Sequence, residues 1–282
     1  MQTKYKSVYM LRLVFIGIFV VSSLCSGQNF LFQGEFGSLK GPSSFDINAS
    51  SGIFVVVENE IIKMDTLGRV IKKTGGYGWA TATFDEIPDI HVNALQVIAA
   101  DKNNDRIQIF DKDLNFLSEF KTHDYENEDY QFRYPTAVGI SGIGDLYILD
   151  SENSRILKYN LRGEYLLGIG GYDAGDYQLN QPKDFVTDAR GSIYVLDEKQ
   201  LVIFDQFGAG MNKIDIPSKY KKLRAYRSGI MAIADDEILF INLSENNKSV
   251  EKFPDTVIFD AKFNHGKLYI LTDSEIKVFS KK

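Results

Sequence analysis

The sequence is poor in cysteine and tryptophan, and helical periodicity is hard to find in it. Cys25 is the only cysteine among 282 residues, so the chain cannot form an internal disulfide, and Trp79 is the only tryptophan. Beyond residues 1–27, no run of ten or more residues shows the 3.6-residue apolar period of a helix. No G-x-S-x-G elbow marks an activated serine. These absences predict an all-β chain and leave it without an evident catalytic group.

A positively charged and then apolar segment opens the chain. Lys4, Lys6 and Arg12 precede the run LVFIGIFVVSSLC, and small residues follow it. This order predicts a secretory signal peptide over residues 1–27, cleaved near Gly27, and therefore an exported protein that is periplasmic, cell-surface or extracellular. An uncleaved membrane anchor is the alternative, and only in that case do we expect contact with a membrane.

Acidic residues outnumber basic residues. The chain has 32 Lys and Arg against 38 Asp and Glu, a net charge of −6. Removing the three cations of residues 1–27, which contain no acid, changes the charge from −6 to −9 (−6 − 3). Because nucleic-acid binding depends on cations that neutralise phosphates, we expect no nucleic-acid partner. The basic stretch SKYKKLRAYR (218–227) fits a solvated strand edge or an acidic partner better.

Proline is scarce, and its placement is regular. Six short apolar segments, each ending near a bulky residue and Asp, Asn or Ser, recur along the chain, and one proline precedes each unit at spacings of 46, 47, 47, 35 and 37. Proline cannot donate to a β-ladder, so it belongs in a connection or at the first residue of a strand. The six prolines are Pro42, Pro88, Pro135, Pro182, Pro217 and Pro254.

The units have the content of propeller blades. The third unit reads as four short strands, AVGIS, DLYILD, RILKYN and EYLLGIG, separated by turns. The sequence therefore predicts a six-bladed β-propeller of four-stranded antiparallel blades over residues 28–282. We expect a monomer whose last blade is completed by the N-terminal strand NFLFQGEFG. The approximate blades are 38–80, 81–127, 128–174, 175–215, 216–253, and 254–282 with 28–37.

Two units resemble a known repeat family. The segments VIAADKNNDRIQIFDKDLNFL and LYILDSENSRILKYNLRGEYL resemble the NHL repeat, in which an apolar strand, Asp, an Asn-containing turn and Arg-Ile follow one another. The Gly-rich linkers at 75–90 and 170–185 fit the same pattern. The resemblance implies a six-bladed propeller. It does not fix a function, because the family includes lyases, RNA- and protein-binding modules and sensor domains.

The acidic turns of these two units have two possible roles. They could bind a cation such as Ca²⁺, which prefers oxygen ligands, or they could be structural. An arginine stands where a further oxygen ligand would be needed, so we assign the turns a structural role and expect Asn to bond local backbone while Asp and Arg pair between neighbouring units. We predict no metal site or cofactor, with Ca²⁺ the ion that these turns leave possible. The residues are Asp101, Asn104, Arg106, Asp150, Asn153 and Arg155.

The connections between units are the candidate binding segments, because they surround one mouth of the central channel on the face that carries the acidic turns. Aromatic rings beside glycines suit a ligand contact, although they could instead pack between blades. Charges of both signs near the channel could orient a polar group or could simply be solvated. The candidate ligand-binding residues are Tyr77, Trp79, Asp89, Arg133, Lys183, Asp184 and Arg224.

Two functions follow from these residues. A three-histidine zinc centre, as in lyase members of the NHL-repeat family, is not expected, because His123 and His265 fall on opposite faces of the predicted propeller. We predict no catalytic residues. The first hypothesis is an exported, non-enzymatic binding or scaffolding module for a protein or a small polar ligand. The alternative is a metal-dependent hydrolase or lyase that uses acidic channel residues.

Overall fold

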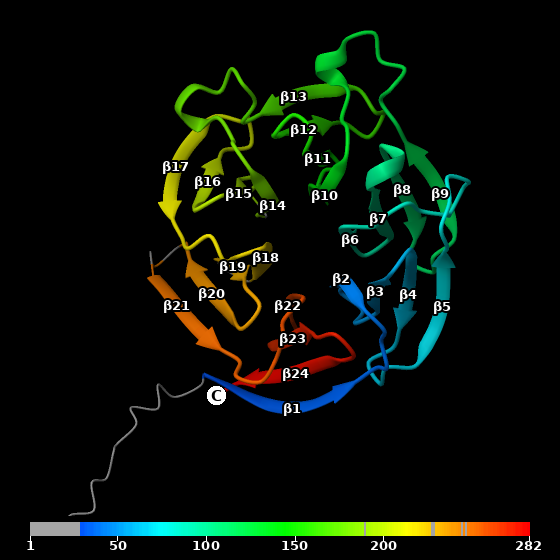
Figure 1. Ribbon diagram of the computed structural model, residues 1–282, viewed down its shortest axis with the longest axis vertical. Coiled ribbons are helices and arrows are strands. Elements are labelled where there is room, and N and C mark those ends of the chain that lie inside the picture. The colour runs from blue at the N-terminus through cyan, green and yellow to red at the C-terminus, as the bar shows by residue number, and fades with distance from the viewer. Residues whose placement is uncertain (1–28, 189, 227–228, 244, 246) are drawn as a thin grey trace, which may run out of the picture.

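The fold is a ring of six antiparallel sheets around a central axis (Figure 1). The computed structural model describes residues 29–282 except 189, 227, 228, 244 and 246, and these residues form six four-stranded sheets. The prediction of an all-β, six-bladed propeller is confirmed. The predicted signal peptide, residues 1–27, lies outside the described residues.

In blades 1 to 5 the strands run outward from the axis in chain order, and in blade 6 the outermost strand is β1. Blade 1 contains β2 (Pro42–Ile47), β3 (Ile53–Val57), β4 (Glu60–Met64) and β5 (Val70–Gly75). Blade 2 contains β6 (Ile90–Val92), β7 (Gln96–Asp101), β8 (Arg106–Asp111) and β9 (Phe116–Phe120). Blade 3 contains β10 (Pro135–Ile140), β11 (Leu146–Asp150), β12 (Arg155–Tyr159) and β13 (Tyr165–Ile169).

The second half of the ring repeats this order. Blade 4 contains β14 (Pro182–Thr187), β15 (Ile193–Asp197), β16 (Gln200–Phe204) and β17 (Gly210–Asp215). Blade 5 contains β18 (Lys222–Tyr226), β19 (Gly229–Ile233), β20 (Glu237–Asn242) and β21 (Asn247–Lys252). Blade 6 contains β22 (Asp260–Asn264), β23 (Lys267–Leu271), β24 (Ile276–Lys281) and β1 (Phe30–Phe36). Short 3-10 helices lie at Lys102–Asn104 (η1), Glu128–Tyr130 (η2) and Gly175–Tyr177 (η3).

The N-terminal strand closes the ring. β1 pairs antiparallel with β24, from Phe30 opposite Lys281 to Phe36 opposite Ile276 (Figure 1). Asn29 extends this closure to the neighbouring blade, because its backbone N and Nδ2 donate to the carboxylate of Glu251 at 2.6 and 2.9 Å. The first strand of the described chain therefore covers the outer edge that β24 would otherwise expose.

The core lies between neighbouring blades rather than within one sheet. In the cluster between blades 1 and 2, Phe54 and Phe110 are fully buried, and Phe84 from the connecting segment is buried with them. Phe132 and Leu179 occupy the corresponding places in the next two connecting segments. Each connecting segment thus supplies an apolar anchor, which explains why the sequence repeats its connections as well as its strands.

The ring has two distinct faces. The segments that join one blade to the next lie on the same face as the turns between second and third strands, and we call this the connector face. Hydrogen bonds prove the proximity: Asn104 Nδ2 donates to the Gly78 carbonyl at 3.0 Å, and Ser154 Oγ donates to the Asn180 carbonyl at 3.2 Å. Among the described residues, none forms a helix with the length and apolar character needed to span a bilayer.

Candidate functional site

The acidic turn of blade 2 holds the connecting segment in place. Arg106 is almost fully buried, and its Nε donates to Asp101 Oδ2 at 2.6 Å. The rest of its guanidinium donates to the carbonyls of Trp79, Ala80 and Thr83 at 2.8–3.0 Å. Five donors in one planar fork suit this multiple capture of carbonyls, which lysine could not reproduce.

Blade 3 repeats the arrangement. Arg155 donates from Nε to Asp150 at 2.9 Å and from Nη2 to the Gln131 carbonyl at 3.0 Å, and Asn153 donates to Asp150 at 2.8 Å. In both blades the Asp–Arg pair forms within one unit, not between neighbouring units as the sequence suggested. The reason is geometric: the arginine is the first residue of the third strand and lies directly opposite the aspartate that ends the second strand.

The innermost strands place polar residues around the channel at two depths. Strand register assigns residues to the upper layer, toward the connector face, when they lie opposite the penultimate residue of the second strand in blades 1 to 4, or opposite its last residue in blades 5 and 6. The lower layer lies two residues further along each innermost strand. The upper layer contains Ser44, Asp89, Ala137, Asp184, Lys222 and Asp260, and the lower layer contains Asp46, His91, Gly139, Val186, Arg224 and Lys262.

Four aspartates of these layers connect neighbouring blades. Each accepts a hydrogen bond from a backbone amide on the innermost strand of the next blade, so the carboxylates bridge four of the six junctions. The pairs are Asp46 with Val92 N at 2.8 Å, Asp89 with Val138 N at 3.3 Å, Asp184 with Leu223 N at 2.8 Å, and Asp260 with Phe45 N at 3.3 Å.

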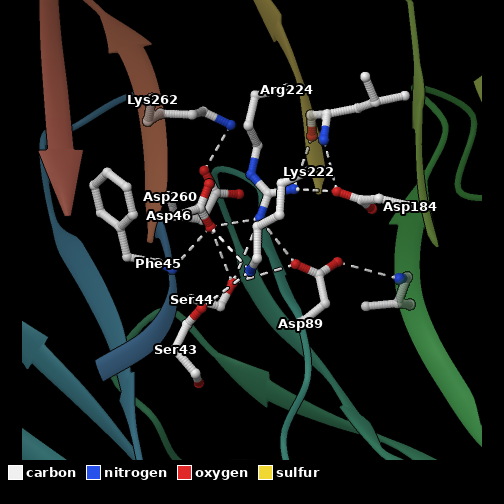
Figure 2. A network of polar contacts seen from close by, with 12 residues as sticks. Ser43, Ser44, Phe45, Asp46, Asp89, Asp184, Lys222, Arg224, Asp260 and Lys262 are labelled. Atoms are coloured by element: carbon white, nitrogen blue, oxygen red, sulfur yellow. Dashed lines mark hydrogen bonds and ion pairs between the residues drawn. The ribbon is translucent and has the colours of Figure 1, made fainter. Parts of the chain in front are cut away.

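Arg224 joins three of these carboxylates at the centre of the channel (Figure 2). Its Nη2 lies 2.6 Å from Asp260 Oδ2 and 3.0 Å from Asp89 Oδ1, and its Nη1 lies 3.2 Å from Asp184 Oδ2. The side chain therefore contacts blades 2, 4 and 6 from blade 5. Only 7% of Arg224 is exposed, so water screens these charges weakly.

The charges of the channel are close to balanced. Lys262 pairs with Asp46 at 2.6 Å and Lys222 with Asp260 at 3.4 Å, so three cations face four carboxylates. Burial opposes the ionisation of Asp260 and Asp46, but the neighbouring cations outweigh it and hold the pKa of each below its ordinary value. Burial dominates at Asp184, where it raises the pKa to about 7.

This network limits what the channel can bind. Arg224 occupies the point on which Asp89, Asp184 and Asp260 converge, where a metal ion would have to sit (Figure 2). Beside the network remains a cavity of about 100 Å³, lined in part by His91 and Lys262, which is small for an organic ligand. Among the described residues, no group of three or more His, Cys, Asp or Glu is arranged to hold a metal ion.

A larger hollow lies on the connector face. It has a volume of about 500 Å³ and is formed by the segment between blades 2 and 3, the acidic turn of blade 3 and the segment between blades 3 and 4. We call it the connector hollow. It is lined by Glu128, Asp129, Gln131, Arg133, Glu152, Asn153, Ser154, Arg155, Tyr172, Gln178 and Leu179.

The structure separates the seven predicted ligand-binding residues into four places. Asp89, Asp184 and Arg224 meet in the channel, and Arg133 lines the connector hollow. Lys183 joins neither group. It occupies the irregular step between Pro182 and Asp184, and its Nζ donates to the carbonyls of Ser218 and Tyr220 at 2.8 and 3.3 Å. A one-residue irregularity of this kind reverses the side to which a strand residue points.

The aromatic side chains Tyr77 and Trp79 do not pack between the blades. They are 72% and 79% exposed, while their backbones are fixed by a bridge to Phe84 and by the hydrogen bond from Arg106. Tyr172, which sequence reasoning did not select, is likewise 79% exposed on the segment between blades 3 and 4. The connector face therefore presents rigidly anchored backbone with solvent-exposed rings.

Sequence reasoning missed several channel residues. Ser44, Asp46, Lys222, Asp260 and Lys262 belong to the Arg224 network but were not selected. Aligning the innermost strands against the second strands would have placed them at the depth of Asp89 or of Arg224. Of the residues that line the connector hollow, the sequence analysis had selected Arg133, Asn153 and Arg155. The others carried no comparable signal, because they come from segments of unlike sequence.

Comparison with known proteins gives partial matches in sequence and a nearly complete match in structure. No family model matches the chain. It is 33% identical over 146 residues to Protein brain tumor of Drosophila melanogaster, and 30% identical over 145 residues to B-box type zinc finger protein ncl-1 of Caenorhabditis elegans. Each match covers 50% of this chain, but only 13% and 16% of those relatives.

Solved structures share the fold over most of the chain. A streptogramin B lyase has a TM-score of 0.64 at 13% identity, with 90% of this chain and 98% of the lyase covered. Virginiamycin B lyase from Staphylococcus aureus has the same TM-score at 10% identity, with 90% and 100% covered. At such low identity the likeness concerns the fold alone.

Proposed function

We propose that the chain is an exported, NHL-like propeller that serves as a non-enzymatic binding or scaffolding module and takes a protein partner on the connector face. The observation that carries this proposal is the connector hollow, with exposed rings on anchored backbone beside it. A volume of about 500 Å³ lies within the usual range for ligand sites. The sequence likeness to the two animal proteins, together with the Asn-Arg turns, supports the assignment to the NHL-like group.

The channel also favours a binding function over catalysis. A metal-dependent hydrolase or lyase would need Asp89 and Asp184 as ligands or proton carriers that face a substrate. Both carboxylates instead contact Arg224 and the backbone amide of a neighbouring blade. Their arrangement favours a structural role in closing the ring, and a binding function then falls to the connector face.

A displayed library of random dodecapeptides tests the proposal. Peptides selected on the purified protein should lose binding to Trp79→Ala and Tyr172→Ala variants, because each removes a large exposed ring without touching the core. Ile143→Ala and Leu161→Ala are matched controls, since these side chains are equally exposed but lie on turns of the opposite face. Selected peptides that bind all four variants alike would refute a site on the connector face.

A further inference from the structure

Most of the carboxylates around the connector hollow lack an ion-pair partner among the described residues. Seven exposed carboxylates lie on the segments and turn that form the hollow, and we call them the acidic arc. They are Asp124, Glu126, Glu128, Asp129, Glu152, Asp173 and Asp176. Asp124 has only exposed His123 as a partner, at 3.1 Å, and Asp129 lies 3.9 Å from Arg155. In the part of the chain that the structure describes, the other five have no ion-pair partner within 4.0 Å.

The basic residues that the structure describes in the stretch 218–227 are in the opposite condition. Lys219 pairs with Glu237 at 2.8 Å, and Lys221 pairs with Asp235 at 2.6 Å. Lys222 and Arg224 both form an ion pair with Asp260 in the channel. The described cations of the stretch 218–227 therefore already have acidic partners, whereas five carboxylates of the acidic arc have none among the described residues.

Aromatic rings accompany these carboxylates. Tyr172 lines the hollow itself. Tyr134 is tied to both neighbouring turns, since its amide donates to Asp105 at 2.7 Å and its carbonyl accepts from Ser151 Oγ at 2.6 Å. Its ring is partly exposed. Ring faces attract lysine and arginine side chains, and the attraction adds to that of nearby carboxylates.

The connector face is continuous from Trp79 to the connector hollow. Asn104 bonds to Gly78, Asp105 to Tyr134, and Ser154 to Asn180, so each turn is joined to the segments beside it. A small cation would engage only one point of such a surface. An extended chain can contact several carboxylates and rings at once, which is the arrangement that yields useful affinity from individually weak exposed contacts.

We propose that the connector hollow and its acidic arc bind an extended polypeptide segment rich in lysine and arginine. This inference rests on the proposed binding function and specifies its partner. Arg133, the cation of the hollow that has no ion-pair partner among the described residues, is outnumbered by Glu128, Asp129 and Glu152. Partners that carry phosphate, such as nucleic acid or an anionic membrane, would meet repulsion from the same field.

The peptide selection described above tests the partner chemistry. We expect the selected dodecapeptides to be enriched in lysine and arginine over the unselected library. A synthesised peptide should bind the Glu128→Gln/Glu152→Gln/Asp173→Asn variant about tenfold more weakly, since exposed ion pairs contribute little individually but three are removed. The matched control removes three exposed carboxylates of the same face over blades 5 and 6, in Asp236→Asn/Asp255→Asn/Asp273→Asn, and should change binding less than twofold.

The possible results distinguish the two proposals. Peptides without enrichment in basic residues, whose binding still requires Trp79 and Tyr172, would overturn the basic partner and leave the binding surface in place. Equal losses in both triple variants would overturn the placement at the acidic arc. A 20-nucleotide single-stranded RNA that binds the protein, and loses binding in the first triple variant, would overturn the polypeptide assignment. Melting temperatures verify that every variant is folded.

Discussion

Replacing Arg224 with alanine should destabilise the propeller strongly. The substitution removes one cation that contacts Asp89, Asp184 and Asp260 at 2.6–3.2 Å and leaves these carboxylates buried without it. Removing one partner of a buried ion pair costs about 3–5 kcal/mol, because the remaining charge stays desolvated. For a domain of this size, the melting temperature should then fall by about 6–20 °C.

Urea unfolding at neutral pH measures this loss, since urea does not screen charge as guanidinium does. Arg133→Ala is the control: it removes another arginine of the same chain, but one that is exposed on the connector face, and should change stability by less than about 0.5 kcal/mol. A second variant, Arg224→Ala/Asp260→Asn, should recover part of the loss by removing one uncompensated charge. If Arg224→Ala unfolds within about 0.5 kcal/mol of the wild type, the ion pairs do not hold the ring closed.

Three further predictions concern the channel carboxylates and the contacts of Arg106. Millimolar Ca²⁺ should raise the melting temperature of Arg224→Ala but not of the wild type, because the convergent carboxylates are the ligands that this ion prefers. Asp184→Asn should gain stability relative to the wild type as the pH rises from about 4 to 7 in urea unfolding. Burial raises the pKa of this carboxyl to about 7, so the folded state keeps a proton that the unfolded state releases, and the contribution of Asp184 to wild-type stability falls as the pH rises through that window. Burial also lowers the pKa of His91. Its contribution to stability has the opposite pH dependence and is common to both proteins. Arg106→Met should speed hydrogen exchange of the Gly78 and Phe84 amides, which lie in the segment that the guanidinium holds, while amides of the equivalent segment before blade 4 stay unchanged.

The strand pattern, the number of blades and the closing strand could all be predicted from the sequence. These features are local: a run such as DLYILD alternates toward a core, ends in a turn, and recurs after the next proline. Closure by β1 followed from counting strands, since the last unit ends after its third. The Asp–Arg pairs are local as well, because Asp101 and Arg106 are five residues apart and face one another across one hairpin, but the prediction that they join neighbouring units was wrong.

The channel network and the connector hollow were decided by the tertiary structure. Arg224 lies 135 residues from Asp89 and 36 from Asp260, and no local pattern states that the ring brings them within hydrogen-bond distance. The irregular step at Lys183 diverted a predicted channel residue to the adjoining segment. Sequence periodicity fixes which side of a strand a residue occupies, whereas the partner it meets depends on how six blades close around one axis.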